Sequence, residues 1–121
     1  MLDLVGVLSM PNVLRLKATK DGQMVGFIAC DIRRSENVAW IATIGVMPDQ
    51  RRQGIGELLL CEAESRLDVS WLRLSVRVSN QDAIRLYQRL GYAKKTIWPA
   101  YYADREDAVV MEKWVIPANG L

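Results

Sequence analysis

Residues 40–59 constrain the fold of this chain more than any other segment. The apolar run 40–46 predicts a buried strand, and Pro48 ends its ladder of hydrogen bonds. Gly54 and Gly56 then precede apolar residues at helical spacing, which predicts a strand, a turn and a helix. Glycines let the backbone of such a turn approach a ligand, and the first N–H groups of a helix lack partners. The segment therefore predicts an anion-binding turn large enough for a pyrophosphate.

Two known glycine motifs fail here on spacing. The dinucleotide-binding pattern G-x-G-x-x-G requires a glycine where this chain has Leu59, and the Gly-Lys-Ser/Thr of the Walker loop is absent. The pattern that remains is R-x-x-G-x-G, which places Arg51 and Arg52 at the mouth of the predicted anion site. Taken alone, such a glycine pair is more typical of a simple tight turn than of a ligand site.

Composition excludes several classes of protein. The 121 residues, half of them apolar, predict one domain over 1–121. The net charge of +2 is spread along the chain and does not favour nucleic acid as a partner. No segment is long and apolar enough to span a membrane, so we expect a cytoplasmic protein with no membrane partner. Histidine is absent, which removes the commonest general base and the commonest zinc ligand.

The two cysteines do not indicate a metal centre. Cys30 and Cys61 both lie in apolar patterns, and they lack C-x-x-C spacing. We expect two buried free thiols in a reducing compartment, and no metal cofactor.

Alternating and helical patterns predict a mixed α/β (α+β) fold with a sheet of about six strands and two main helices. We expect strands at 13–18, 24–32, 37–46, 71–78, 92–98 and 108–115, and helices at 53–67 and about 80–90. The turn Lys20-Asp21-Gly22 joins the first two strands as a hairpin. Ser79 and Asp82 have capping-box spacing at the start of the second helix, and Gly91 ends it. The expected buried helical positions are Ile55, Leu58, Leu59, Ala63 and Leu67, then Ala83, Leu86, Tyr87 and Leu90.

A second pattern follows the strand at 71–78. The segment 80–92 has the form N-x-x-A-x-x-L-Y-x-x-x-G-[FY]. With R-x-x-G-x-G before it, the chain resembles the GNAT superfamily of N-acetyltransferases over roughly residues 13–115. Residues 100–111, with a tyrosine pair and a Glu-Asp-Ala strand entry, are similar to the subgroup that acetylates protein N-termini, including the ribosomal-protein alanine acetyltransferases. The resemblance implies one acyl-CoA N-acyltransferase domain that transfers acetyl from acetyl-CoA to a primary amine.

The resemblance also implies a set of residues that bind acetyl-CoA. The backbone at the end of the strand that leads into the glycine loop would hold the thioester carbonyl, and the loop itself would hold the pyrophosphate. These residues are Ile44, Gly45 and Val46, then Arg51, Arg52, Gln53, Gly54, Ile55, Gly56 and Glu57. Asn80 would reach the pantetheine arm, or serve as a plain helix cap. Tyr87 would protonate the departing thiolate, or be an ordinary core tyrosine with a satisfied hydroxyl.

The general base is the point where the chain departs from the similar subgroup. Those enzymes typically carry a glutamate where this chain has Ser75, which cannot hold a proton but can orient a water molecule. Deprotonation would then fall to solvent or to a carboxylate elsewhere, such as Glu36 or Glu106. A weak base suits an α-amine, with a pKa of about 8, better than a lysine amine with a pKa of about 10.4.

The loop between the last two strands is the predicted acceptor site. Tyr101 and Tyr102 would line the groove for an acceptor peptide or small amine, and Asp104, Glu106 and Asp107 would attract a cation. The alternative is a solvated turn whose aromatic rings pack on the edge of the sheet. Trp98 differs from the basic or polar residues common before such a tyrosine pair, so peptide specificity does not carry over.

The N-terminal segment is the largest departure from the family pattern. Members usually begin with a strand and two helices, whereas here the first hairpin follows residues 1–12, in which Leu2, Leu4, Val5 and Leu8 are expected to form the tail of one helix. An uncovered apolar edge would favour a homodimer. Three functions remain in order of preference: an active N-acetyltransferase, a weak or inactive acetyl-CoA-binding module, and a nucleic-acid-binding or structural module.

Overall fold

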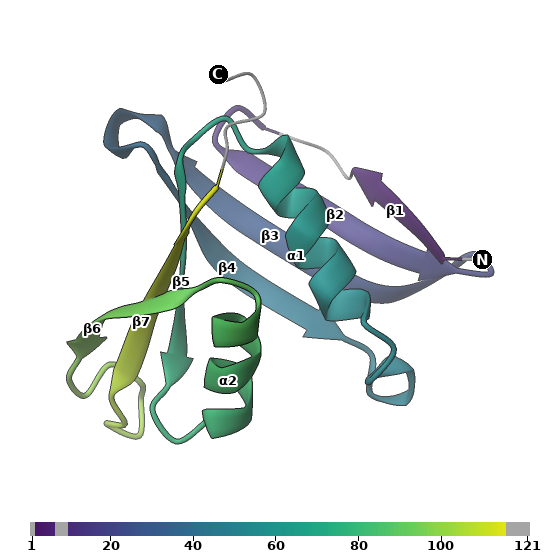
Figure 1. Ribbon diagram of the computed structural model, residues 1–121. Helices are drawn as coiled ribbons and strands as arrows, with labels where there is room; N and C mark the ends of the chain where they lie inside the picture. The colour runs from purple at the N-terminus through teal and green to yellow at the C-terminus, as the bar shows by residue number, and fades with distance from the viewer. Residues whose placement is uncertain (1, 7–9, 116–121) are drawn as a thin grey trace.

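The computed structural model describes residues 2–6 and 10–115, which form one mixed sheet with two α-helices on it (Figure 1). The strands are β1 (Leu2–Gly6), β2 (Val13–Lys20), β3 (Gln23–Arg33), β4 (Val38–Val46), β5 (Trp71–Arg77), β6 (Ala93–Trp98) and β7 (Ala108–Trp114). The helices are α1 (Ile55–Arg66) and α2 (Gln81–Arg89), with short 3-10 turns at Arg34–Glu36 and Pro48–Gln50. The strand order is β1-β2-β3-β4-β5-β7-β6, with β4 and β5 parallel and every other pair antiparallel. The predicted mixed fold with two main helices is confirmed.

The seventh strand, β1, corrects the expectation of a helical tail at the N-terminus. Residues 2–6 pair antiparallel with β2, from Leu2 opposite Lys20 to Gly6 opposite Leu16. Leu2 and Leu4 are half-buried against the core while their neighbours are more exposed, which is the period of two of a strand. The pairing with β2 satisfies backbone groups that so short a segment leaves open as a helix. Leu8 lies outside the described residues.

The hairpin of β2 and β3 forms as the sequence predicts. Its two loop residues, Asp21 and Gly22, both have positive φ angles, 53° and 81°. Aspartate followed by glycine is the preferred sequence for such a two-residue turn, because the twist of the turn then matches that of the strands.

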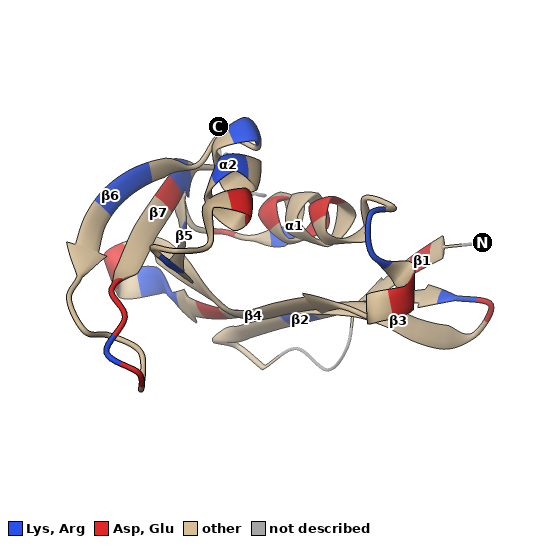
Figure 2. Cartoon of the chain, turned by 90° about the horizontal axis from the view of Figure 1, so that it is seen from below, with Lys and Arg blue, Asp and Glu red and all other residues tan. Residues whose placement is uncertain are grey.

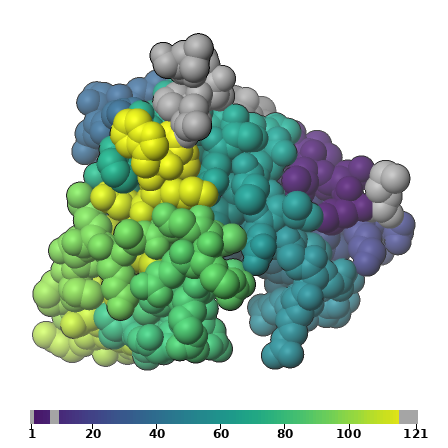
Figure 3. All heavy atoms as spheres, viewed as in Figure 1, coloured from purple at the N-terminus to yellow at the C-terminus, as the bar shows by residue number. Residues whose placement is uncertain are grey.

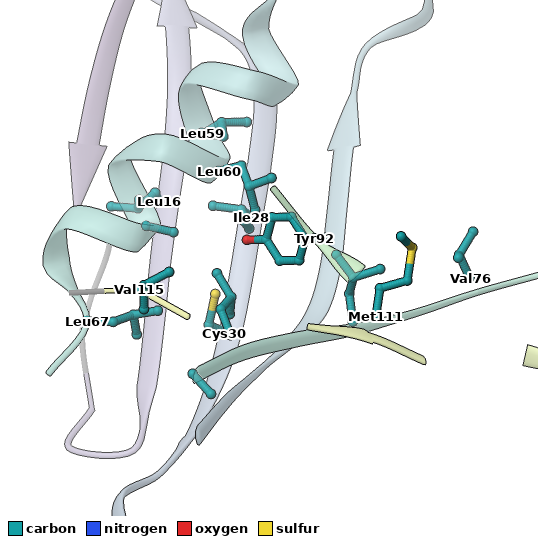
Figure 4. Packing of buried hydrophobic residues seen from close by; sticks show 14 of the residues in the cluster. Leu16, Ile28, Cys30, Leu59, Leu60, Leu67, Val76, Tyr92, Met111 and Val115 are labelled. Atoms are coloured by element: carbon teal, nitrogen blue, oxygen red, sulfur yellow. The ribbon is translucent and has the colours of Figure 1, made fainter. Parts of the chain in front are cut away.

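Helix α1 packs on the centre of the sheet, and Gly26 of β3 lets it come close. A Cβ atom at Gly26 would lie 2.9 Å from the Ile55 Cγ2 atom and 3.1 Å from Leu59 Cδ1. Leu60 is buried instead of the predicted Leu58, which is 45% exposed. Because Leu58, Leu59 and Leu60 are consecutive, the apolar pattern alone does not determine which of them faces the sheet. Figure 4 shows Leu59 and Leu60 above the core residues of the strands.

Helix α2 begins and ends close to its predicted bounds, and Asn80 caps it, which was one of the two roles expected for that residue. Asn80 accepts a hydrogen bond from the Ala83 N–H at 3.2 Å, so Asn80, and not Ser79, is the N-cap. The φ angle of Gly91 is 99°, which confirms its role just after the helix. Ile84 is the fully buried residue of α2, whereas the predicted stripe of Ala83, Leu86, Tyr87 and Leu90 is half-buried.

Both helices lie on the same face of the sheet, and β5, β7 and β6 curl away from the plane of the other strands (Figure 2). We refer to the other side as the open face, because no described helix covers it. Of the two cysteines, Cys30 is buried as expected and Cys61 is exposed on α1, contrary to expectation. Among the described residues, neither helix has the length and apolar character needed to cross a membrane.

Candidate active site

A gap between β4 and β5 forms the centre of the candidate site. The two strands pair only over residues 38–40 and 71–73, ending with Trp40 opposite Arg73. Beyond that point β4 continues to Val46 paired with β3 alone, so the backbone of residues 41–46 has one free edge. A bulge at Ala42 bends β4 where this free edge begins. The predicted thioester-binding residues Ile44, Gly45 and Val46 lie on the free edge beside the gap.

The glycine loop follows β4 and leads directly into α1. The Met47 N–H bonds to the Val25 carbonyl at 2.9 Å, which ends the strand, and Pro48 opens a 3-10 turn. Arg52 and Gly54 have φ angles of 66° and 78°, in the left-handed region. These two left-handed residues turn the chain sharply from β4 toward the start of α1.

The start of α1 offers unpaired donors at the end of this turn. Gly54 has no side chain to cap the helix, and Leu58 is the first residue whose N–H bonds to a helical carbonyl, that of Gly54, at 3.0 Å. The N–H groups of residues 55–57 therefore have no acceptor within the described part of the chain. Together with the helix dipole they form an anion site. A Cβ atom at Gly56 would lie 3.8 Å from Val46 Cγ2, at the wall of the same cavity.

The cavity at this loop has a volume of about 280 Å³. Its lining residues are Val46, Gln50, Arg51, Arg52, Gly54, Ile55, Gly56, Glu57 and Leu86. Leu86 belongs to α2, so the second helix forms the far wall. Figure 3 shows this hollow in the surface, between the teal atoms that follow β4 and the green atoms of α2. Most of the predicted pyrophosphate residues are thus brought together, whereas Gln53 lies outside the lining and contacts Gln50 and Lys20. Sequence reasoning missed Leu86 as a wall, because its spacing predicted only a core position.

The charged side chains of the loop are arranged around this cavity. Arg51 and Arg52 are exposed, and Arg51 Nε donates to the Val46 carbonyl at 3.2 Å, which fixes its stem at the cavity mouth. The Glu57 carboxylate lies 3.6 Å from Arg89 of α2, so the two helices are also linked by charge. Free N–H donors, two guanidinium groups and a cavity wall of glycine fit the pyrophosphate of acetyl-CoA.

Tyr87 lies on the helix-covered side of the sheet next to the core. Its ring meets that of Tyr92 edge-on, with centroids 5.8 Å apart. Among the described residues, none forms a hydrogen bond with its hydroxyl, and both expected roles, proton donor and core tyrosine, stay predictions. Burial raises the pKa of Tyr87 above its ordinary value. The side chain therefore keeps a proton that it can donate.

Tyr92, unlike Tyr87, has a hydrogen-bond partner for its hydroxyl. Its hydroxyl donates to Glu64 Oε2 of α1 at 2.8 Å, and Lys113 of β7 donates to Glu64 Oε1 at 3.0 Å. Burial, and then the charge of Glu64, raise the pKa of Tyr92. This buried network joins α1 to β7. Sequence spacing did not predict it, because its members lie far apart along the chain.

Ser75 does not meet Tyr87. Leu74 and Val76 face the helix-covered core, so Ser75, between them on β5, faces the open side of the sheet. Neither carboxylate considered as a base lies free beside it. Glu36 is at the other end of the nine-residue β4, roughly 30 Å from Val46 at the usual strand rise. Glu106 accepts from the Ser79 N–H and from Arg77, both at 2.9 Å. Hydrogen bonds from Ser79 and then Arg77 lower its pKa, which makes Glu106 a weak base.

The loop after β6 lies on the open face, and its acidic residues are paired. Arg77 Nη1 contacts Asp104 Oδ2 and Glu106 Oε1, each at 2.9 Å, and its guanidinium lies 4.2 Å over the ring of Tyr102. Asp107 accepts from the Ala100 N–H at 2.8 Å. Tyr101 and Tyr102 meet edge-on at 5.1 Å, as a paired unit on this loop. The predicted attraction for a cation is therefore weakened, since these carboxylates already have partners.

No group of three or more potential ligand side chains for a metal ion occurs within residues 2–6 and 10–115.

Comparisons with known proteins agree with this geometry. Residues 8–92 match the Acetyltransferase (GNAT) family. The chain is 38% identical over 104 residues to the [ribosomal protein bS18]-alanine N-acetyltransferase of Escherichia coli, covering 81% of this chain and 69% of the relative. It is 30% identical over 114 residues to the catalytic subunit of the N-terminal acetyltransferase A complex of Arabidopsis thaliana, covering 88% of this chain and 59% of that protein.

Solved structures share the fold. The crystal structure of the E. coli ribosomal-protein-S18-alanine N-acetyltransferase matches with a TM-score of 0.77 and 37% identity, over 88% of this chain and 72% of the other. A putative streptothricin acetyltransferase from Bacillus anthracis, solved in complex with acetyl coenzyme A, matches in fold with a TM-score of 0.77 and 23% identity, over 88% and 65%. The glycine loop, the gap between β4 and β5 and these similarities lead to one conclusion: this chain belongs to the acetyltransferase (GNAT) family.

Proposed function

We propose that this protein transfers an acetyl group from acetyl-CoA to a primary amine, either the α-amine of a protein N-terminus or the amine of a small molecule. The main support is the gap between β4 and β5, which leaves the free edge of β4 with Val46 beside the cavity at the glycine loop. The relatives named above acetylate amines, and one of the similar structures holds acetyl coenzyme A.

In this proposal the protein binds acetyl-CoA, orients its thioester toward the amine, and transfers protons. The loop N–H groups and Arg51 and Arg52 hold the pyrophosphate. Backbone groups on the free edge of β4 hold the carbonyl oxygen of the thioester, which supplies an activated acetyl group. The amine nitrogen bonds to the carbonyl carbon, the carbon–sulfur bond breaks, and Tyr87 donates its proton to the sulfur. The proton released by the amine passes to water near Ser75, and solvent then reprotonates Tyr87.

The pairing of the nearby carboxylates favours an α-amine over a lysine side chain. Glu106 is held by Arg77 and Ser79, whose hydrogen bonds lower its pKa, so this carboxylate is a weak base. An amine with a pKa of about 8 reaches its neutral form near pH 7 without a strong base, whereas a lysine amine is about 0.1% neutral there. The same observation supports the second candidate, a module that binds acetyl-CoA but transfers its acetyl group slowly or not at all.

Titration of the protein with acetyl-CoA by calorimetry, alongside a Gly56→Glu variant, tests the cofactor site. Gly56 has space for a Cβ atom, and an acidic residue in the first turn is favourable, so the variant should fold with unchanged or slightly higher stability. Its carboxylate would occupy and repel the pyrophosphate site. We expect affinity for acetyl-CoA to fall at least about tenfold.

Ser65→Glu is the matched control, since it adds the same charge to the exposed far end of α1. It should bind acetyl-CoA like the parent. Equal affinity of the parent and Gly56→Glu would place the cofactor elsewhere, and no binding by the parent would refute the proposed activity.

A further inference from the structure

Two residues of β7 point toward the open face and are buried there, although no described helix covers that face. Val109 and Met111 belong to the helix-side core, so Ala108 and Val110, which alternate with them, face the other way. Ala108 and Val110 are nevertheless only 0% and 1% exposed. Side chains of the sheet and of the loop after β6 are the groups available to cover this part of the open face.

Three aromatic residues near this part of the sheet contact one another, and we call them the aromatic stack: Trp40, Trp98 and Tyr101. The rings of Trp40 and Trp98 stack with centroids 5.4 Å apart, and Trp98 meets Tyr101 at 5.0 Å. Trp40 is on β4 and Trp98 on β6, with β5 and β7 between them. The two rings therefore meet across two intervening strands, in the part of the sheet that curls in Figure 2.

The register places the aromatic stack beside the gap. Trp40 pairs with Arg73 at the last position before β4 and β5 separate. Trp98 is aligned with Ala108, which pairs with Arg77. The stack thus passes over the Ser75 and Val110 pair, which lies between these two levels. It ends at Tyr101, which is 53% exposed and leaves ring surface open to solvent.

The charges around the stack disfavour an acceptor with a second positive charge. Glu112 is paired with Arg73 at 2.9 Å and with Lys95 at 3.5 Å. The Arg73 guanidinium lies 5.9 Å over the Trp40 ring, so a cation already occupies the position where an acceptor ammonium would bind by cation–π attraction. The Arg77 guanidinium likewise lies over the ring of Tyr102, and it also forms an ion pair with Asp104. What remains available to an acceptor is flat apolar surface.

We propose that the aromatic stack forms the acceptor wall of the gap and selects amines whose neighbouring group is aromatic or otherwise flat and apolar. This inference rests on the proposed function and narrows its acceptor class. A peptide that begins with phenylalanine is a preferred acceptor, while a peptide that begins with alanine and an aliphatic diamine are poorer ones. Contact of one aromatic side chain with Trp98 and Tyr101 corresponds to a preference of about two- to tenfold.

Amine-dependent release of free thiol from acetyl-CoA tests the inference with two otherwise identical peptides, one starting with phenylalanine and one with alanine. The parent should show a kcat/KM about two- to tenfold higher for the phenylalanine peptide. In Trp98→Leu, which keeps apolar cover but removes the flat ring, this preference should disappear. Trp98→Phe should retain it.

Trp114→Leu is the control, because Trp114 is an exposed tryptophan that contacts Trp71 instead of the stack. It should keep the parent's preference. The inference is wrong if the parent favours the alanine peptide or a diamine, or if Trp98→Leu keeps the preference of the parent. Thiol release with those acceptors would leave the proposed activity intact. No amine-dependent release with any acceptor would overturn the proposed function itself.

Discussion

At the scale of single residues, position in the fold separates side chains that look alike in the sequence. Cys30 and Cys61 both lie in apolar patterns, yet the first is buried in β3 and the second exposed on α1. Tyr87 and Tyr92 also differ, because Tyr92 bonds to Glu64 while the Tyr87 hydroxyl has no described partner. These differences depend on which side of a helix meets the sheet and on partners far along the chain. The local sequence pattern shows neither the helix face that meets the sheet nor the distant partners.

The pH dependence of stability should report the burial of Cys30. Burial raises the pKa of its thiol from 9.0 to about 12. The folded state therefore holds this proton more tightly than the unfolded state, and the stabilisation is complete below pH 9 and lost as the pH rises from 9 to 12. Chemical denaturation between pH 8 and 11 measures how the free energy of unfolding falls with rising pH. The fall should be less steep in Cys30→Ala than in the parent, by up to about 1.4 kcal/mol per pH unit.

Tyr92 acts in the same direction in both proteins, and the charge of Cys30 is one of the smaller causes of its raised pKa, so the variant removes the Cys30 contribution together with that small part of the Tyr92 contribution. Cys61→Ala, a change at an exposed position, provides the control for removal of a thiol. Parallel pH curves for the parent and Cys30→Ala would contradict the burial of this thiol.

At the scale of elements, local patterns predicted most of the fold. The Asp21-Gly22 hairpin, the alternation of β5 and the glycine-flanked α1 all follow from rules that act over a few residues. The strand β1 was missed because five residues with two leucines fit either a helix or a strand, and pairing with β2 decides between them. The aromatic stack was also missed, since Trp40 and Trp98 lie far apart in the chain and on strands that are not neighbours in the sheet.

The start of α2 allows the structural role of Asn80 to be separated from a role in binding. Asn80→Ala removes the cap on the Ala83 N–H and should cost about 1 kcal/mol in the free energy of unfolding, whereas Asn80→Ser preserves a capping oxygen and should cost much less. If Asn80 also contacts the pantetheine arm, Asn80→Ser should still weaken acetyl-CoA binding. Thermal unfolding and calorimetric titration of both variants give the two quantities. Equal stability of Asn80→Ala and the parent would contradict the cap.

At the scale of the whole molecule, the two faces of one sheet differ in what they carry. The helix-covered face carries α1, α2 and Tyr87, and the open face carries Ser75 and the aromatic stack. The gap between β4 and β5 connects them, so acetyl-CoA and amine would meet there from opposite sides. The homodimer expected from the sequence stays a prediction, as do the roles of the individual site residues.

Amine-dependent release of thiol from acetyl-CoA, compared between the parent and Tyr87→Phe, tests the proposed transfer reaction. Because no described residue bonds to the Tyr87 hydroxyl, the variant should fold normally and bind acetyl-CoA with nearly the parent affinity. Loss of a general acid should lower kcat about 100-fold or more. The account predicts thiol release by the parent that depends on the amine and is nearly absent in Tyr87→Phe. Equal rates in the two proteins, or parent rates that do not respond to the amine, would contradict it.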